Sequence, residues 1–420
     1  MPIGRKVVVM RRPSLGLLWL LLFTGLVRTA AMYCLPGAWS DPDGYGKLAV
    51  NLVEHRQFAL YPGAPTSYRP PLYPLLLAST VTGGKIDPLR VAALHVVLGV
   101  ATVAVTYALA RRWGSPLLAA WMAGAWVAVN PVLVYQSTRL MTETLATLLV
   151  VATGWMGERW MARRSRVDAV GCGILFAGCA LCRAELIAWF ALFAGMAVGI
   201  GNHSGRTGRW SSWLVMVFLF AAVCLPWWLR NYHRWGTWIL TTTHGGYTLW
   251  LANNDDFYDY LWDAKRRQQG PWSSAKLDAQ YAELARAARY SEPEVDRRAT
   301  RLAWQTMRRR PREALYAVFY RWGEFWNPWP RSTQTRPLAQ WQSMLLAGIY
   351  CLVYVAAVCG VYHAAGRRSF SQWWIWISLV VALHLVHAVY WTNARMRAPV
   401  EPLLALLAIE PCAGRRDSGR

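Results

Sequence analysis

The sequence has 420 residues, a formal net charge of +23, 55% hydrophobic residues and only 16% charged residues. Soluble globular domains usually contain about 25% charged residues. Several apolar runs approach the ~20 residues that a helix needs to cross a bilayer of about 30 Å. This composition excludes a soluble enzyme, a disulfide scaffold and a disordered tail, and it indicates a multi-span membrane protein. The 26 Trp residues agree, because indole rings favour the membrane–water interface.

The excess of basic residues does not point to nucleic acid, because Lys and Arg lie mostly between apolar runs and in one long loop. We therefore expect membrane lipids as partners and no nucleic acid. Seven of the eight Cys lie in or beside apolar runs and Cys412 lies in the tail, without the spacing of a zinc site or a disulfide framework. We interpret them as small core side chains.

Ten membrane spans are predicted. A basic stretch precedes the first apolar run, which is long and lacks a small-residue cleavage site, so we interpret it as an uncleaved helix with its N-terminus in the cytoplasm. The spans are predicted at residues 14–35, 89–110, 116–135, 142–157, 168–182, 184–201, 212–229, 341–362, 370–391 and 398–410.

The charges of the short loops support this orientation. Each predicted inner connection is rich in Arg and nearly free of acid, as the positive-inside rule requires. The inner basic residues are Arg111 and Arg112; Arg159, Arg163, Arg164 and Arg166; Arg206 and Arg209; Arg367 and Arg368; and Arg415, Arg416 and Arg420. The sequence therefore predicts a multi-pass protein of the cytoplasmic (inner) membrane with both termini in the cytoplasm.

Five regions follow from this topology. Residues 1–35 hold the basic segment and the first transmembrane helix, and residues 36–88 form the first extracytoplasmic loop. Transmembrane helices 2–7 occupy 89–229, a helical extracytoplasmic segment occupies 230–337, and the last three helices with a basic tail occupy 338–420.

The segment 230–337 is too polar to span and is predicted to be helical. An amphipathic helix is indicated by the i, i+4, i+7, i+11 spacing of Leu277, Tyr281, Leu284 and Ala288. Ser291 and Glu294 have the spacing of a capping box for the next helix, whose buried face would include Val295, Ala299 and Leu302. The aromatic stretch 314–329 is expected to lie along the membrane interface. We expect this segment to govern acceptor choice.

The first outer loop contains two carboxylates on a Pro/Gly turn, Asp41 and Asp43, just before an amphipathic helix that starts near Tyr45. The apolar face of that helix would rest on the membrane surface. Partial desolvation at this depth can tune a carboxylate toward general-base strength. Helix N-capping by Asp is the alternative interpretation.

Arg69 precedes a short apolar run, Leu75–Val81, that reads as an interfacial helix or a re-entrant segment. There the guanidinium would meet a lipid phosphate, or it would simply snorkel to the interface.

Other ionisable residues lie near span ends, namely Glu143, Arg183 and Glu185. They either line a polar cavity or form ion pairs between helices. The stretch His244-Gly245-Gly246-Tyr247 is typical of a loop that covers a site, although turn chemistry also explains it. His384 and His387 are three residues apart on one span, but no third metal ligand is evident, so no metal site is predicted.

Several motifs, in this order, carry a family resemblance. They are Asp41 four residues before Tyr45 with Leu48-Ala49 following, Arg69-Pro70-Pro71-Leu72, Thr138-Arg139-Leu140-Met141-Thr142-Glu143, Cys182-Arg183-Ala184-Glu185, Pro226-Trp227-Trp228-Leu229-Arg230-Asn231 and Asn393-Ala394-Arg395-Met396-Arg397-Ala398-Pro399. The set resembles the GT-C glycosyltransferases that use polyprenyl-phosphate sugars. It is most similar to bacterial relatives of glycosyltransferase family 39, which include protein O-mannosyltransferases and the aminoarabinose transferase acting on lipid A.

The resemblance implies an all-α polytopic fold with about ten transmembrane helices and interfacial helices in the first outer loop. It implies transfer of a hexose or pentose from a polyprenyl-phosphate donor to an acceptor hydroxyl on the extracytoplasmic side, in glycosylation of the cell envelope. An outer-loop Asp is the base in this family, which assigns Asp41 by its offset from Tyr45, with Asp43 as second candidate. The resemblance implies that the donor phosphate is bound by Arg69, Arg395 and Arg397. It implies that the cavity is lined or supported by Tyr45, Glu143, Arg183, Glu185 and Tyr247.

The chemistry of such a site is consistent. A polyprenyl phosphate leaves as a stabilised anion, so positive charge on the phosphate and a base for the acceptor proton suffice, and direct displacement inverts the anomeric centre. Two departures from the family pattern are present: Pro42 separates acids that are adjacent in some members, and Met396 replaces an aromatic residue.

Two alternatives stay open. A non-enzymatic flippase or transporter of lipid-linked sugars should show two similar halves or matching broken spans, and neither is visible in the sequence. A structural scaffold would leave the outer acidic and basic residues unexplained.

Overall fold

The computed structural model describes residues 15–35, 37–199, 208–268, 270–289, 291–329, 340–366 and 370–412. Several sequence predictions lie outside the described residues. These are the basic stretch before residue 15, the inner positions Arg206, Arg367 and Arg368, and the tail that holds Arg415, Arg416 and Arg420.

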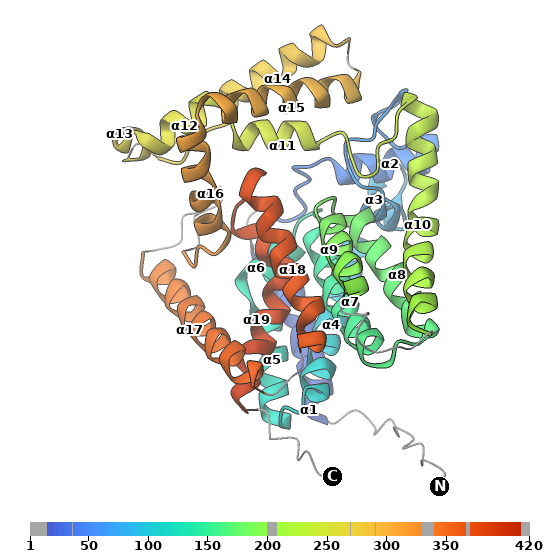
Figure 1. Cartoon of the computed structure of the whole chain (residues 1–420), viewed down its shortest axis with the longest axis vertical. Helices are drawn as coiled ribbons and strands as arrows, with labels where there is room; N and C mark the ends of the chain where they lie inside the picture. Colours follow the sequence, from blue (N-terminus) through green and yellow to red (C-terminus); the bar gives the residue numbers. More distant parts are fainter. Residues whose placement is uncertain are drawn as a thin grey trace.

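A helical bundle forms the larger part of the molecule (Figure 1). Its helices are α1 (Leu15–Cys34), α4 (Pro88–Arg112), α5 (Leu117–Val129), α6 (Pro131–Ser137), α7 (Glu143–Arg163), α8 (Arg166–Cys182), α9 (Leu186–Gly199), α10 (Gly208–Trp235), α17 (Gln340–Ala365), α18 (Phe370–Val389) and α19 (Glu401–Ala408), with the 3₁₀ turns η1 (Ala394–Val400) and η2 (Glu410–Cys412). A helix therefore occurs at each predicted span. The third span is broken, because Pro131 cannot continue the hydrogen-bond ladder of α5. There α5 and α6 meet at a bend of 48°.

Some of these helices are long enough to cross a membrane. Among the described residues, α1, α4, the Trp210–Trp235 part of α10 and α17 are long and apolar enough to cross a membrane, and the bent α5–α6 pair would be a fifth span. Two shorter apolar stretches lie in α9 and α18. Helix α19 has eight residues and rises about 12 Å, much less than the ~30 Å of a hydrocarbon core. The all-α multi-span class is confirmed, whereas ten crossings remain a prediction.

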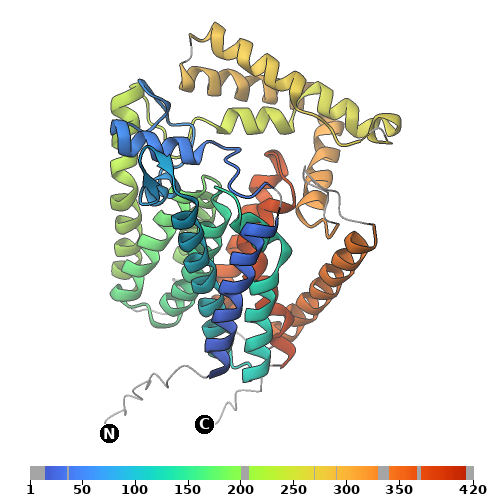
Figure 2. The ribbon, with the colours of Figure 1, turned by 180° about the vertical axis from the view of Figure 1, so that it is seen from behind.

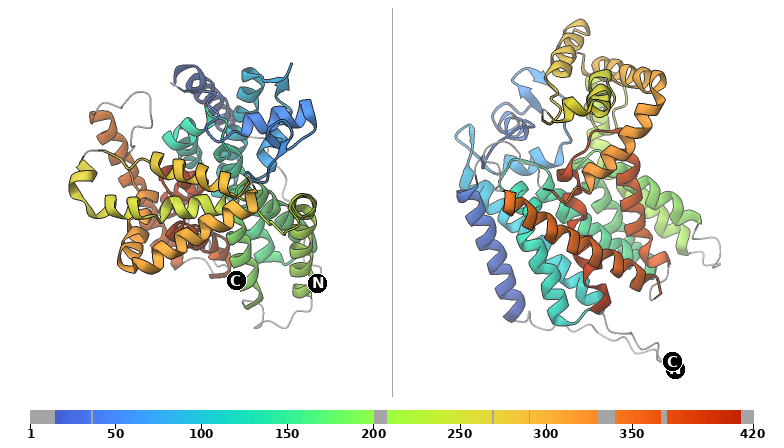
Figure 3. Two further views of the ribbon diagram at one scale, coloured as in Figure 1. Left: turned by 90° about the horizontal axis from the view of Figure 1, so that it is seen from above. Right: turned by 90° about the vertical axis from the view of Figure 1, so that its left-hand side faces the viewer.

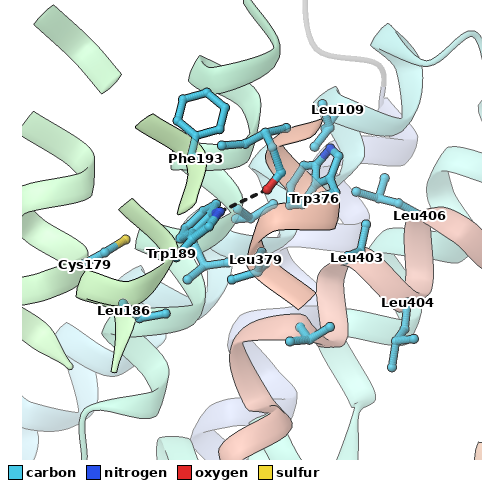
Figure 4. Packing of buried hydrophobic residues seen from close by; sticks show 14 of the residues in the cluster. Leu109, Cys179, Leu186, Trp189, Phe193, Trp376, Leu379, Leu403, Leu404 and Leu406 are labelled. Atoms are coloured by element: carbon cyan, nitrogen blue, oxygen red, sulfur yellow. Dashed lines mark hydrogen bonds between the residues drawn. The ribbon is translucent and has the colours of Figure 1, made fainter. Parts of the chain in front are cut away.

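Aromatic side chains fill the centre of the bundle, where α8, α9 and α18 meet (Figure 4). Trp189 and Phe193 of α9 are fully buried, and both pack on Phe176 of α8. The indole N–H of Trp189 donates to the carbonyl of Ile375 at 3.0 Å. Because its one polar atom is paired, the large Trp189 side chain can be buried without an unsatisfied donor.

Helix α17 approaches the backbone of α19 closely at Gly360. A Cβ at Gly360 would lie 1.8 Å from the carbonyl oxygen of Leu407 in α19, whereas a Cβ at Gly348 of the same helix would meet nothing within 4 Å. We expect Gly360→Ala to destabilise the protein by about 1–3 kcal/mol, because the clash is with backbone. Gly348→Ala should be neutral or slightly stabilising. Thermal unfolding of the two purified variants tests this, and equal melting temperatures would contradict the close α17–α19 packing.

The first outer loop folds against one end of the bundle (Figure 2). It contains α2 (Tyr45–His55), α3 (Leu72–Ala78) and the antiparallel hairpins β1 (Ala59–Tyr61) with β2 (Ala64–Pro65) and β3 (Val81–Thr82) with β4 (Lys85–Ile86). The amphipathic helix predicted after Asp43 is confirmed as α2. Its apolar face consists of Tyr45, Leu48 and Ala49, which are buried against α3 and the start of α7. The expectation that this face rests on the membrane surface is therefore wrong.

The hairpins were not predicted. The turn between β3 and β4 is formed by Gly83 and Gly84, whose φ angles are +57° and +71°. Two consecutive residues with positive φ make the tight turn that matches strand twist, and glycine adopts it without strain. Thr-Gly-Gly-Lys was therefore a readable hairpin signal.

A second layer of helices lies across the same end of the bundle (Figure 3). It consists of α11 (Gly245–Ala252), α12 (Asp255–Trp262), α13 (Ala264–Gln268), α14 (Ala275–Ala287), α15 (Glu292–Arg309) and α16 (Pro311–Phe325). The predicted amphipathic helix is confirmed as α14, and Val295 and Ala299 of α15 are buried as predicted.

One detail of this layer differs from expectation. Ser291 is the N-cap of α15 but makes no side-chain capping bond, and Glu294 pairs with Arg297 and Arg298, so the predicted capping box is wrong. The aromatic helix α16 packs on α18, while its Leu315 and Phe319 side chains are exposed, and its place along the membrane interface stays a prediction. Buried Arg321 of α16 donates to the carbonyl of Ala388 at 3.0 Å, which ties the two helices together.

Candidate functional site

The turn before α2 is held on the bundle by backbone hydrogen bonds. Trp39 N–H donates to the carbonyl of Thr138 at 2.7 Å, and Leu140 N–H donates to the carbonyl of Ser40 at 3.1 Å. Gly44 has a φ of +76°, and a Cβ there would lie 2.7 Å from Leu60. Only glycine fits this position. The turn fixes both Asp41 and Asp43 relative to α7.

Asp41 points back onto the first turn of α2. Its Oδ2 accepts hydrogen bonds from the backbone N–H of Gly46 at 2.9 Å and of Lys47 at 3.3 Å, so the capping interpretation describes one of its oxygens. Its Oδ1 has no hydrogen-bond partner among the described residues. Burial raises the pKa of Asp41 above its ordinary value, although the amide hydrogen bonds oppose the shift. Asp41 therefore has one oxygen that positions it and one buried oxygen without a hydrogen-bond partner among the described residues.

Asp43 faces the opposite way, toward two arginines. Arg69 Nη2 lies 2.8 Å from Asp43 Oδ1, and Arg395 Nη1 lies 3.7 Å from Asp43 Oδ2. Arg69 precedes α3 and Arg395 lies in η1, so residues more than 300 positions apart meet here. Asp43 orients both guanidinium groups.

The remaining predicted charges extend this arrangement. Arg395 Nε lies 3.2 Å from Glu143, Arg183 Nη1 lies 2.9 Å from Glu143, and Arg183 Nε lies 2.5 Å from Glu185. Three guanidinium and three carboxylate groups therefore alternate in one ion-pair cluster: Arg69, Asp43, Arg395, Glu143, Arg183 and Glu185. The ion pairs expected between Glu143, Arg183 and Glu185 are present, and a supporting role in the site stays a prediction.

Arg395 is the most exposed arginine of this cluster. Its Nε faces Glu143 and its Nη1 faces Asp43, and Nη1 also lies 4.0 Å from Met141 Sδ. Its side chain is 30% exposed, against 14% for Arg69 and 7% for Arg183, whose Nη2 contacts Met396 Sδ. Of the three guanidinium groups, that of Arg395 is therefore the most accessible to an anion.

Aromatic rings surround Arg69. Its guanidinium carbon lies 5.7 Å from the Tyr45 ring centre and 5.2 Å from the Tyr68 ring centre. Burial raises the pKa of both phenols, that of Tyr68 to about 12, so neither ionises near neutral pH. Burial also lowers the pKa of Arg69, but nearby Tyr45 and Asp43 more than offset this and the net shift is upward. Tyr68, which directly precedes the Arg69-Pro70-Pro71-Leu72 motif, was not predicted as a site residue.

The loop that ends at His244 packs on Tyr68, the residue before Arg69. His244 lies 4.3 Å from the Tyr68 ring and stacks on Tyr247 at 5.2 Å. Burial, with Arg69 and Arg395 nearby, holds the pKa of His244 well below its ordinary value, so it is neutral. Tyr247 itself donates to Asp278 at 2.6 Å and belongs to the helical layer. It supports His244 and does not touch the ion-pair cluster.

Helix α15 anchors this loop. Glu292 accepts hydrogen bonds from Ser67 N–H and from the Thr243 hydroxyl, both at 2.8 Å, and so joins the layer to the first outer loop. A Cβ on Gly246 would lie 2.2 Å from the carbonyl oxygen of Asp296. Only glycine at position 246 allows the backbones of α11 and α15 to approach this closely.

Arg397 is placed apart from this cluster. It is 1% exposed and pairs with Glu401 at 2.7 Å, and it donates to the carbonyl of Phe325 at 2.9 Å. All of these partners belong to the core between α16 and α19. The structure therefore brings Arg69 and Arg395 together and leaves Arg397 in a structural position.

His384 and His387 of α18 are of a residue type that binds metal ions. The described segments contain no group of three or more His, Cys, Asp or Glu side chains that could hold a metal ion. His384 accepts a hydrogen bond from the Trp326 indole at 2.8 Å, and its other ring nitrogen lies 2.7 Å from the Val380 carbonyl, so both nitrogens are occupied.

A cavity of about 440 Å³ lies beside Asp41. It is bounded by the turn at Trp39, the outer side of α2, both hairpins and the start of α4. Asp43, Arg69 and Arg395 do not line it. The turn 41–46 therefore places its two carboxylates in different surroundings: Asp41 lines the cavity and Asp43 binds the arginines.

Comparison with known proteins identifies the fold. No protein-family model and no curated protein sequence matches this chain. Among solved structures, it is similar to the archaeal oligosaccharyltransferase AglB from Archaeoglobus fulgidus, in complex with an inhibitory peptide and a dolichol-phosphate, with a TM-score of 0.52 and 13% identity. The alignment covers 93% of this chain and 50% of the AglB chain. The chain has the GT-C fold.

The GT-C fold predicted from the sequence motifs is therefore confirmed. The chain spans about half the length of the AglB chain that it matches. Two structures of ArnT from Cupriavidus metallidurans are also similar over 94% of this chain and 78% of the ArnT chain. The apo structure has a TM-score of 0.41 and 14% identity, and the structure bound to undecaprenyl phosphate has a TM-score of 0.43 and 12% identity.

Proposed function

We propose that this protein is an integral-membrane glycosyltransferase. It transfers a hexose or pentose from a polyprenyl-phosphate donor to an acceptor hydroxyl on the extracytoplasmic side of the cytoplasmic membrane. The observation that carries this proposal is the partly exposed Arg395, whose guanidinium is held between Asp43 and Glu143, shares Asp43 with Arg69 and lies next to the turn that bears Asp41. The GT-C fold shared with AglB, a structure in complex with a dolichol-phosphate, supports a lipid phosphate as the anion.

Each residue has a defined part in the reaction. Arg69 and Arg395 bind the donor phosphate and neutralise the charge that grows on it as the bond to the sugar breaks. The carboxylate of Asp41 takes the proton of the acceptor hydroxyl while the acceptor oxygen bonds to the anomeric carbon. Attack opposite the leaving phosphate inverts the anomeric centre. Asp43 is a positioning residue that orients the two arginines.

The charge distribution supports the sidedness of this proposal. Helices α4 and α7 begin at the end of the bundle that bears the site, so their Arg-rich ends, Arg111, Arg112 and Arg163, lie at the opposite end. The positive-inside rule puts that opposite end in the cytoplasm and the site outside.

Label transfer tests the proposal. Radiolabelled polyprenyl-phosphate sugars are supplied to membranes with and without the protein, and the label is followed from the lipid to other fractions. We expect label to move onto an acceptor only when the protein is present. If the purified protein instead moves labelled lipid across liposome membranes and transfers no sugar, it is a flippase and the proposal fails.

A further inference from the structure

The cavity beside Asp41 has an unusual charge composition. Only five of the 45 Lys and Arg residues of the chain are lysines, and two of them, Lys47 and Lys85, line this one cavity. Lys47 lies on the outer side of α2 and Lys85 lies in β4. Neither side chain forms an ion pair with a carboxylate in the part of the chain that the structure describes.

The net charge of the cavity favours an anion. Asp41 is the only carboxylate residue in its lining, so two ammonium groups face one carboxylate. Lysine is a strongly hydrated point charge that contributes little to packing, and a neutral acceptor would gain nothing from two of them. Ammonium groups are common ligands of phosphate.

The rest of the lining is mainly apolar. Trp39, Val50, Leu60, Ile86 and Leu140 form much of the wall. A cavity with an apolar wall and a few placed charges is typical of a site for an amphipathic small molecule. Pro88 at the edge is the first residue of the membrane-spanning helix α4, so the cavity adjoins the bilayer region.

We propose that this cavity binds the acceptor, and that the acceptor is a phosphate ester that also carries a free hydroxyl group. This inference rests on the proposed function. Lys47 and Lys85 bind the phosphate of the acceptor, and the hydroxyl donates to the carboxylate of Asp41, which lines the cavity. The acceptor oxygen then bonds to the anomeric carbon, its proton passes to Asp41, and the bond from the anomeric carbon to the donor phosphate breaks with its electron pair on the phosphate oxygen. The first outer loop, and not only the segment 230–337, then determines acceptor choice.

Binding to the purified full-length protein in detergent tests this. The probes are dihexanoyl phosphatidylglycerol, which has both groups; dihexanoyl phosphatidylcholine, which lacks net charge and the hydroxyl; and glycerol 1-phosphate, which has both groups but no lipid. We expect the double variant Lys47→Ala/Lys85→Ala to bind phosphatidylglycerol at least about tenfold more weakly than the native protein. The double variant Lys47→Arg/Lys85→Arg should retain binding. The matched control is Lys265→Ala/Lys276→Ala, which removes two lysines of the helical layer and should change nothing.

The outcomes separate this inference from the proposed function. Equal binding of phosphatidylglycerol by the native protein and the Lys47→Ala/Lys85→Ala variant, or equal loss in the matched control, overturns the inference. Lysine-dependent binding of glycerol 1-phosphate as tight as that of the lipid supports the site and identifies a soluble acceptor. If sugar transfer occurs but its acceptor KM is unchanged in Lys47→Ala/Lys85→Ala, the inference fails while the proposed function stands. If lysine-dependent binding is found but no donor sugar is ever transferred, the proposed function fails.

Discussion

Replacing Asp41 with asparagine should lower the rate of sugar transfer by at least about 100-fold, because a positioned general base typically contributes 10²- to 10⁴-fold. Asparagine keeps the size of the side chain, and its amide oxygen can still accept from Gly46 N–H. Folding should not suffer. Burial raises the pKa of Asp41, so the folded state disfavours the ionised carboxylate and a neutral residue is tolerated at least as well. Transfer of labelled sugar, normalised to protein in the membrane, gives the rate, and thermal unfolding gives the stability.

The matched control for Asp41 is Asp87. It lies in the same outer loop and likewise accepts hydrogen bonds from two helix N-terminal amides, Leu89 N–H at 2.9 Å and Arg90 N–H at 3.3 Å, but it is not part of the site. Asp87→Asn should leave the transfer rate within about twofold of the native protein, since it removes a similar cap without removing the base. Undiminished transfer by well-folded Asp41→Asn would refute the assignment of the base.

The pH dependence of transfer gives a second check on Asp41. A base acts only when ionised, so the rate should fall on acidification as its carboxylate takes up a proton. Because the pKa is raised, this fall should begin at a higher pH than an exposed aspartate would give. The residual rate of Asp41→Asn should lack this acid limb. If the pH–rate profile of Asp41→Asn keeps the same acid limb, a group other than Asp41 causes the fall in rate.

Replacing Arg69 with alanine should weaken binding of the lipid phosphate by about 10- to 100-fold, since a hydrogen bond to a charged group contributes ~1.5–3 kcal/mol. Arg69→Lys should restore only part of the affinity, because a single ammonium cannot form two parallel bonds to phosphate. Equilibrium binding of labelled polyprenyl phosphate to purified protein measures this directly. Arg297→Ala, which removes an exposed arginine paired with Glu294 in the helical layer, is the control and should bind normally.

A double variant separates two explanations for a loss of lipid-phosphate affinity in Arg69→Ala. Without Arg69, Asp43 loses its 2.8 Å partner and its negative charge would repel phosphate. Adding Asp43→Asn removes that repulsion. If the guanidinium itself binds phosphate, Arg69→Ala/Asp43→Asn stays weak, whereas full recovery would show that Arg69 only neutralises Asp43. Wild-type affinity in Arg69→Ala alone would also exclude it as a ligand.

Local signals in the sequence predicted the helices and their order well. Apolar run length predicted a helix at each span, and the spacing of Leu277, Tyr281 and Leu284 predicted α14. These signals depend on residues close in the chain, so a helix shows them directly. One prediction failed where two local options competed. Glu294 had the spacing of a capping box but pairs with Arg297 and Arg298.

The candidate site was predicted as a set of residues, but not as an arrangement. Arg395 and Arg397 looked equivalent because they are two positions apart in one motif. In η1 their side chains diverge, so that Arg395 reaches Asp43 and Arg397 is buried against Glu401. Asp41 and Asp43 likewise looked interchangeable, yet the Gly44 turn gives them different partners.

By itself, the sequence determined that this is a multi-span helical membrane protein, because composition and apolar run length reflect the cost of leaving backbone and charge in hydrocarbon. It also predicted which carboxylates and guanidinium groups would form the candidate site. Only the tertiary structure decided which of them meet, since contacts between Arg69, Asp43, Glu143 and Arg395 join four segments far apart in the chain. It also decided that Lys47 and Lys85 share a cavity with Asp41, because that depends on how two hairpins fold over α2 and leaves no periodic trace in the sequence.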